Sequence, residues 1–264
     1  MEIFDGVPSF LAWNPPYRPE IIGKGLLPTE SKMVVAGPYK VFKSMLLQQM
    51  GFCVSEGIPF IGFPTARTKV LIVQFEIAKS RFRERLRKYQ AGQGGGSNLA
   101  VSTALMGIRI DTPAGLQEIE AGLNQVKPGL LILDPLYKII SGSESSAEEL
   151  QRLFNHLDYL IHQYGISLVI SAHCRKLRLD AKGQVVDLGL DEIMGSVRIP
   201  GWVDSAILIQ RLGGDNRRLL FEARHREDDL PPVEISFNRN TLEFKVVGGT
   251  GVVGSGVGAP SITP

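Results

Sequence analysis

Short apolar runs alternate with amphipathic segments along most of the chain, which predicts strands and helices in turn. The apolar runs have the length and composition of buried strands and cover 33–37, 70–76, 129–134 and 166–173. The amphipathic segments predict helices over 44–57, 80–90, 113–126 and 147–165. Ser80 and Thr112 stand where helix N-caps are expected. Residues 99–107 (LAVSTALMG) are interpreted as one further short strand.

Strands interleaved with helices at this spacing predict an α/β fold, with a mostly parallel, twisted sheet covered by helices on both faces. The last third of the domain differs, because its segments alternate apolar and polar residues and are joined by GGDN and NRN. These segments predict antiparallel strands that extend the sheet. The domain is expected to cover 31–247, preceded by a proline-rich arm over 1–30 and followed by a glycine-rich, disordered tail over 248–264.

Bulk composition narrows the class of protein without naming a partner. With 44% hydrophobic and 21% charged residues in 264, the chain is expected to bury a full core. The net charge of +2 neither requires nor excludes nucleic acid. Two cysteines without framework spacing argue against structural zinc, and the acidic, proline-containing N-terminus is unlike a signal peptide. We therefore expect a cytoplasmic protein with no membrane partner.

The segment GPYKVFKS lies between the first strand and the first long helix, as a phosphate-binding P-loop does. Backbone N–H groups of such a loop point at an anion, and Lys43 adds a full charge beside the β and γ phosphates of ATP. Ser44 is expected to offer its hydroxyl to Mg²⁺. The nucleotide-binding residues are therefore expected to be Gly37, Pro38, Tyr39, Lys40, Val41, Phe42, Lys43 and Ser44.

Phe42 departs from the P-loop consensus, which has glycine immediately before the lysine. Glycine there lets the backbone approach phosphate closely. The side chain of Phe42 has to point away from the nucleotide if the loop is to keep its function. The alternative interpretation of the segment is an ordinary turn between a strand and a helix.

Three polar residues stand at the ends of predicted strands. Asp134 closes LLILD and is expected to hold Mg²⁺, whereas Glu76 closes VLIVQFE and is expected to accept a proton from the attacking water. His173 follows SLVISA and is suited to sensing the γ-phosphate. Parallel strands bring their carboxyl ends to one edge, which favours a shared site. The alternatives are a turn-capping Asp134, a surface Glu76 paired with Lys79 or Arg81, and a structural histidine.

The order of these motifs resembles that of the RecA/DnaB-type ATPases. The resemblance rests on GPYKVFKS, Glu76, LLILDPLYKI, ISAH and GSVRIPGWVDSAILIQR, and it looks nearest to the plasmid RepA-like replicative helicase branch. It implies a RecA-like P-loop core with catalytic roles for Lys43, Glu76 and His173. It further implies a ring, commonly a hexamer, with ATP between subunits and single-stranded DNA in the central channel.

Two groups of basic residues acquire roles through this resemblance. Arg224 and Arg226 alternate on one face of LLFEARHRE, where the family inserts an arginine finger into the neighbouring subunit's site. The alternative is that both are solvated charges on an edge strand. The long polar segment after His173 is interpreted as a loop that faces DNA. Its candidate phosphate contacts are Arg175, Lys176, Arg178, Lys182 and Arg198.

The leading hypothesis is a DNA-stimulated ATPase that acts as a replicative helicase or a related motor, with ATP and Mg²⁺ as its cofactors. A RecA-type recombinase or regulatory ATPase is the second candidate. A nucleotide-binding scaffold, in which Phe42 has removed turnover, is the third.

Overall fold

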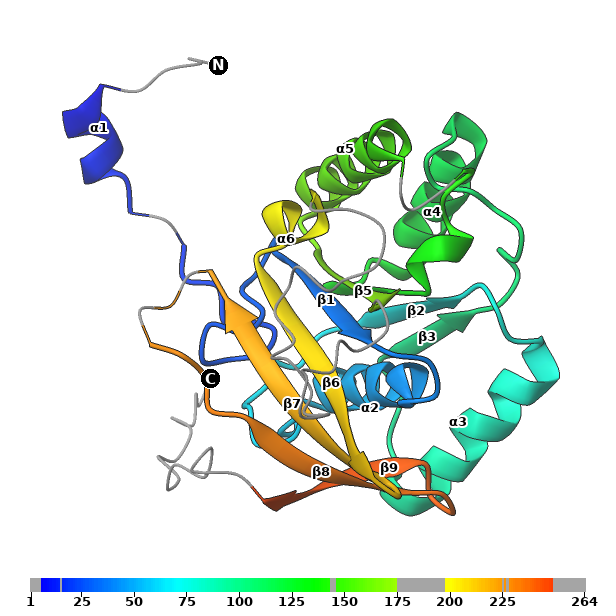
Figure 1. Ribbon diagram of the computed structural model, residues 1–264. Helices are drawn as coiled ribbons and strands as arrows, with labels where there is room; N and C mark the ends of the chain where they lie inside the picture. The colour runs from blue at the N-terminus through cyan, green and yellow to red at the C-terminus, as the bar shows by residue number, and fades with distance from the viewer. Residues whose placement is uncertain are drawn as a thin grey trace, which may run out of the picture.

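The computed structural model describes residues 6–14, 16–142, 146–174, 198–224, 226 and 228–248. In these residues the strands form one nine-stranded sheet with the order β3-β2-β4-β5-β1-β6-β7-β8-β9 (Figure 1). Their bounds are β1 Lys32–Gly37, β2 Val70–Gln74, β3 Leu99–Ser102, β4 Leu130–Asp134, β5 Ser167–His173, β6 Ser205–Gly213, β7 Asn216–Ala223, β8 Val233–Asn238 and β9 Glu243–Gly248.

The sheet is mostly parallel, as predicted. Strands β3, β2, β4, β5, β1 and β6 run side by side in one direction, and β7, β8 and β9 continue the sheet with antiparallel pairs. Strand β6 belongs to both groups, because it is parallel to β1 and antiparallel to β7. The predicted antiparallel extension is therefore confirmed, although its first strand pairs in parallel with the central sheet.

Helices cover both faces of the sheet (Figure 1). Alternation along β1 separates the faces: Val35 belongs to a hydrophobic cluster with Leu46 of α2 (Lys43–Glu56), and Val34 belongs to a second cluster. That second cluster includes Ile119 of α4 (Pro113–Val126) and Leu157 of α5 (Ala147–Tyr164). Helix α3 (Lys79–Gln93) adds Phe82 to the first cluster. The two apolar layers fix the sheet, and with it the positions of the strand ends.

The N-termini of α3 and α4 can be compared with the N-caps that the sequence predicts. The hydroxyl oxygen of Thr112 accepts a hydrogen bond from the backbone N–H of Gly115 at 3.2 Å, so the cap of α4 is confirmed. The cap expected at Ser80 is wrong, because α3 begins one residue earlier, at Lys79, with Ala78 as its N-cap. The structure shows no side-chain cap at Ala78.

The segment before β1 has two unlike parts. A short helix, α1 (Val7–Ala12), stands away from the body with none of its residues buried (Figure 1). By contrast, Ile22, Leu26 and Leu27 are fully buried in the first cluster. The boundary expected near residue 30 stays a prediction, and 249–264 of the expected tail lie outside the described residues. None of the described helices combines the length and apolar character needed to cross a membrane.

Candidate functional site

Four residues predicted from the P-loop and from three strand ends line one cavity of about 610 Å³. Strands β2, β4, β5 and β1 are adjacent in the sheet, so their carboxyl ends meet at one edge. Lys43 approaches from the loop after β1, and Glu76 follows β2. Asp134 ends β4 and His173 ends β5. The structure therefore brings Lys43, Glu76, Asp134 and His173 together.

The loop after β1 has the geometry of an anion-binding turn. Lys43 is the first residue of α2, and its ammonium donates to the carbonyls of Gly37 at 2.8 Å and Pro38 at 3.0 Å. A side chain at Gly37 would meet the Ile209 carbonyl and Val41 at 3.0 Å, so the strand ends in a residue without Cβ. The helix N-terminus and the buried ammonium both favour a phosphate here.

Phe42 occupies the consensus glycine position in a conformation that glycine favours. Its φ is 69° and its ψ is 32°, in the left-handed region. The ring stacks on Phe237, with centroids 4.2 Å apart. The backbone thus follows a path that usually needs glycine, and apolar contacts hold the ring.

Asp134 is buried and hydrogen-bonded from both sides. Gln74 of β2 donates from Nε2 to its Oδ2 at 2.8 Å, and the hydroxyl of Ser171 of β5 donates to its Oδ1. These two donors fix the orientation of the carboxylate. Together with the hydroxyl of Ser44, which lines the same cavity, Asp134 supplies the oxygen ligands that Mg²⁺ prefers. These side chains therefore fit a magnesium ion.

The ammonium of Lys43 lies 3.0 Å from Nδ1 of His173. Burial lowers the pKa of Lys43 to about 8, although Cys174, Asp134 and Glu76 act in the opposite direction. Burial, followed by the charge of Lys43, also lowers the pKa of His173. The contact therefore suits a neutral imidazole that accepts at Nδ1. The ring stacks on that of Tyr39, with centroids 4.2 Å apart, so the P-loop and the end of β5 are in direct contact.

Glu76 is exposed to the cavity. Its carboxylate accepts a hydrogen bond from the Tyr137 hydroxyl at 2.9 Å, and its backbone N–H donates to Oε1 of Gln74 at 2.8 Å. Arg81 pairs instead with Glu84, and the described ion pairs include none between Glu76 and Lys79 or Arg81. The geometry thus favours the expected position at the site over the surface ion pair.

Sequence reasoning missed four residues that complete the site: Gln74, Arg85, Tyr137 and Ser171. Arg85 reaches the cavity from α3, and burial lowers its pKa, while Asp134 and Glu76 act in the opposite direction. Gln74 and Ser171 stand within apolar runs, and a polar residue in a buried strand signals a polar partner. Helical spacing alone did not point to Arg85.

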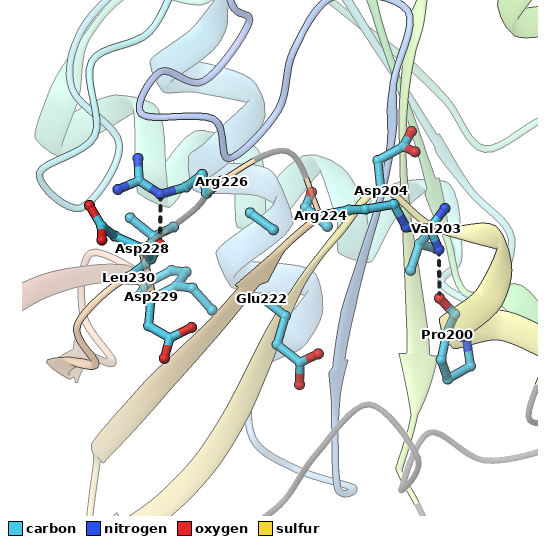
Figure 2. A pocket seen from close by; sticks show the side chains of 12 residues that line it. Pro200, Val203, Asp204, Glu222, Arg224, Arg226, Asp228, Asp229 and Leu230 are labelled. Carbon is cyan, nitrogen blue, oxygen red and sulfur yellow. Dashed lines mark hydrogen bonds between the residues drawn. The ribbon is translucent and has the colours of Figure 1, made fainter.

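Arg224 and Arg226 follow the C-terminal end of β7 and line a separate cavity of about 420 Å³ (Figure 2). The guanidinium of Arg224 donates to the carbonyls of Gly201 at 3.0 Å and Pro200 at 3.3 Å. That of Arg226 donates to the carbonyl of Lys24 at 2.6 Å. Both side chains are therefore held by backbone carbonyls of this chain, away from the cavity of Lys43.

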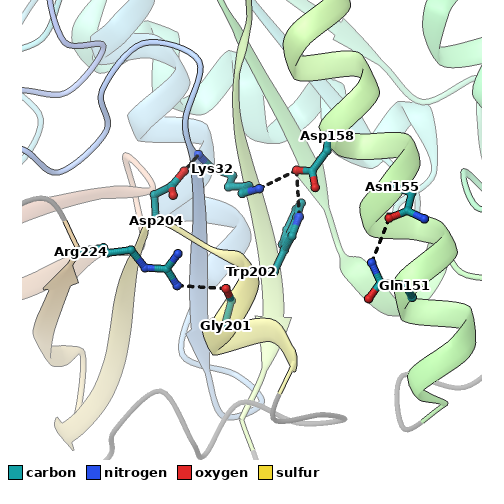
Figure 3. Close-up of polar contacts among 8 residues, drawn as sticks. All are labelled: Lys32, Gln151, Asn155, Asp158, Gly201, Trp202, Asp204 and Arg224. Atoms are coloured by element: carbon teal, nitrogen blue, oxygen red, sulfur yellow. Dashed lines mark hydrogen bonds and ion pairs between the residues drawn. The ribbon is translucent and has the colours of Figure 1, made fainter. Parts of the chain in front are cut away.

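The expected DNA contacts can be placed only in part. Four of them lie outside the described residues, namely Arg175, Lys176, Arg178 and Lys182. Arg198 is the first residue of α6 (Arg198–Trp202), but the structure does not describe its side chain. Figure 3 shows how α6 is anchored. Asp158 accepts from Lys32 at 2.6 Å and from the indole N–H of Trp202 at 3.0 Å. This network ties the end of the predicted DNA loop to β1 and α5.

Comparison with known proteins agrees with the geometry. A family model described as "AAA domain" matches residues 2–178, which include the P-loop, Glu76, Asp134 and His173. A search of curated proteins found no match. Among solved structures, one described as an "ATPase Domain" superposes with a TM-score of 0.61 and 12% sequence identity, over 83% of this chain and 86% of that one. At this identity the likeness establishes the RecA-like fold.

Proposed function

This chain belongs to the AAA-domain family, and from that premise we propose that it is a Mg²⁺-dependent ATPase that works as a helicase-like motor on single-stranded DNA. The observation that carries the proposal is the convergence of Lys43, Asp134 and Glu76 on one cavity beside a helix N-terminus. A cation for phosphate, a fixed carboxylate for a metal ion and a second carboxylate for a proton are the groups that ATP hydrolysis requires.

Each residue has a definite task in the proposed reaction. Lys43 and the first N–H groups of α2 bind the β and γ phosphates, and Ser44 and Asp134 would hold Mg²⁺, which would neutralise charge on the phosphates. Glu76 accepts a proton from a water molecule while the oxygen of that water bonds to the γ-phosphorus. At the same time the bond between the γ-phosphorus and the β–γ bridging oxygen breaks. Tyr137 orients the Glu76 carboxylate through its hydrogen bond. The products are ADP and inorganic phosphate.

The geometry of Phe42 supports a protein that hydrolyses ATP over a scaffold that only binds the nucleotide. Its left-handed backbone retains the loop path that places Lys43 at the start of α2, and its ring is stacked on Phe237. The substitution for glycine thus leaves the Lys43 ammonium at the cavity. The bulky side chain does not by itself disable the loop.

Two features support assembly of several copies. Helix α1 and the residues after it expose large apolar side chains, namely Phe10 at 57%, Leu11 at 76% and Trp13 at 61%. Exposed apolar side chains gathered on one segment favour a protein partner. Arg224 and Arg226 lie away from their own chain's cavity, a position compatible with service in a neighbour's site. We therefore propose a homo-oligomeric ring, with the segment after His173 facing DNA.

The decisive experiment measures ATP hydrolysis with and without single-stranded DNA. Wild type is expected to hydrolyse Mg-ATP faster when DNA is present. Glu76→Gln should lower the rate by roughly 10² to 10⁴ while nucleotide binding persists, because a general base contributes about that much. Lys43→Ala should remove hydrolysis and weaken nucleotide binding. The matched controls are Lys88→Ala and Glu118→Gln, both at exposed helix positions, and both should retain wild-type rates.

The outcomes separate the candidate functions. If the wild type binds nucleotide without hydrolysing it, the nucleotide-binding scaffold is the candidate function that remains. Hydrolysis without any response to DNA would reject the motor. If DNA does stimulate the rate, a strand-displacement assay distinguishes unwinding by a helicase from the strand pairing of a recombinase.

A further inference from the structure

A third cavity, of about 440 Å³, lies beside the P-loop at the hairpin that joins β6 and β7. We call it the arginine pocket. The described residues that line it are Lys40, Phe42, Arg211, Gly213, Gly214, Arg217 and Arg239. Four of these seven residues are cationic, and none is acidic. It shares only Lys40 and Phe42 with the cavity of Lys43.

Arg217 is the most unusual member of the arginine pocket, because it is only 4% exposed. Its Nη1 donates to the carbonyls of Gly214 at 3.0 Å and Asn216 at 2.6 Å. In the described part of the chain its buried Nε has no hydrogen-bond partner. A buried, charged donor without a partner is costly and signals a missing acceptor.

The neighbours of Arg217 add positive charge. Its pKa is lowered first by burial and then by the charge of Arg211, and Arg239 also lowers it. Asp215 partly offsets these charges, but its carboxylate is held by a bidentate contact with Arg239, at 2.6 Å and 2.9 Å. Of the four cations that line the pocket only Arg217 is buried, and the other three are exposed. An anion in the pocket would stabilise the buried charge.

We propose that the arginine pocket binds a small phosphorylated anion at a site distinct from the ATP site. Guanidinium groups match phosphate oxygens in geometry, and several of them together suit an anion with more than one negative charge. The four cations converge on one cavity of about 440 Å³, which suits a small molecule, whereas a polymer needs a track of cations extended along its backbone. The occupant is therefore a diphosphate-like small molecule.

Occupancy of the arginine pocket acts on the P-loop through Phe42. The guanidinium carbon of Arg217 lies 5.0 Å from the centroid of the Phe42 ring, and that of Arg239 lies 5.5 Å from it. Phe42 is the residue immediately before Lys43 and the N-cap of α2. Arg211 also donates to the carbonyl of Tyr39. An anion that draws these arginines together shifts groups that hold the P-loop, so it changes nucleotide affinity.

The test uses inorganic pyrophosphate as the probe and isothermal titration calorimetry as the measurement. The protein is Lys43→Ala, which weakens phosphate binding at the P-loop and makes the result independent of ATP hydrolysis. We expect one pyrophosphate per chain, with affinity that falls as salt rises. Adding Arg239→Gln or Arg217→Gln should each weaken binding by about tenfold or more, since each removes a charge-assisted hydrogen bond.

Arg218→Gln is the matched control. Arg218 is the neighbour of Arg217 on β7, but it pairs with Glu234 at 2.7 Å and does not line the pocket. Its substitution should leave pyrophosphate affinity within about twofold of that of Lys43→Ala. Arg239 is a surface residue, so Arg239→Gln still tests the site if Arg217→Gln fails to fold.

Four results would overturn the proposal. One is the absence of pyrophosphate binding to Lys43→Ala. The second is an equal loss of affinity in Arg218→Gln and Arg239→Gln, which would indicate a diffuse charge effect. The third is full displacement of pyrophosphate by Mg-ADP from wild type, which would mean that the pocket is part of the ATP site. The last is loss of oligonucleotide binding in Arg239→Gln without any pyrophosphate binding, which would assign the arginines to a nucleic acid.

Discussion

The ring of Phe42 stacks on the ring of Phe237, with centroids 4.2 Å apart and planes 22° from parallel. Phe42 is the N-cap of α2, whereas Phe237 belongs to β8 near the far edge of the sheet. The contact therefore joins the P-loop to the antiparallel extension. It also offsets the strain of a large residue in the left-handed region, about 1 to 2 kcal/mol.

The contribution of this contact can be separated from the strain by two substitutions. Phe42→Ala loses the stacking and keeps the strain, whereas Phe42→Gly loses the stacking and relieves the strain. Both should be less stable than wild type, with Phe42→Gly more stable than Phe42→Ala by about 1 kcal/mol. Urea unfolding measures this order. The reverse order would show that the loop does not keep φ near 69° in solution.

The edge where the site forms could be predicted from the sequence, but its supporting contacts could not. Asp134 and His173 are predictable because each follows an apolar run, and parallel strands bring such ends together. Gln74 and Ser171 contact Asp134 only because β4 lies between β2 and β5, an order that the runs themselves do not encode. Arg217 lies in a strand of alternating polar and apolar residues, where a polar residue is expected to be exposed. It is buried because the β6–β7 hairpin lies beside the P-loop.

Ser171 is expected to set magnesium affinity by positioning Asp134. Ser171→Ala removes the hydroxyl that donates to the carboxylate, so the Mg²⁺ concentration for half-maximal hydrolysis should rise by roughly 10- to 100-fold. Ser167→Ala is the matched control on the same strand, because its hydroxyl donates instead to the carbonyl of Pro28 at 2.9 Å. An unchanged Mg²⁺ requirement in Ser171→Ala would show that Ser171 does not position Asp134 for the metal ion.

Lys43 is expected to lower the stability of the nucleotide-free protein. Its pKa of about 8 lies below the ordinary value of 10.5, so between these values the unfolded chain binds more protons and stability rises with pH. Below pH 8 the full penalty for carrying the charge applies, roughly 3 kcal/mol relative to the neutral amine. The hydrogen bonds to Gly37 and Pro38 contribute about 1 to 2 kcal/mol and are lost when the amine is removed.

Replacing Lys43 with an uncharged side chain of similar length tests this penalty. At pH 7, Lys43→Met should unfold at a higher urea concentration than wild type, a gain of about 1 to 2 kcal/mol, and it should not hydrolyse ATP. The gain should shrink as pH rises from about 8 towards 10. Lys88→Met, at an exposed helix position, should show neither effect. A gain that persists unchanged at pH 10 would mean that its origin is not the charge.

Arg224 and Arg226 permit a test of whether neighbouring chains share a site. Each is held by carbonyls of its own chain, and each lies away from the cavity of Lys43 in that chain. If one of them stabilises charge in the next subunit's site, Lys43→Ala and Arg224→Ala should each be nearly inactive alone. Mixing them should restore part of the hydrolysis, because some interfaces then join an intact Lys43 to an intact Arg224.

Mixing Lys43→Ala with Arg226→Ala in the same way identifies which arginine acts in the neighbouring subunit's site. Only the variant of that arginine should be inactive alone and regain hydrolysis in the mixture. Urea unfolding of each single variant separates this role from anchoring, because Arg224→Ala also loses the hydrogen bonds to Pro200 and Gly201. A variant that is inactive, stable and rescued on mixing acts across the interface. If both mixtures hydrolyse ATP no faster than the sum of their parts, neither arginine acts in a neighbour's site, and the two remain anchors of their own chain.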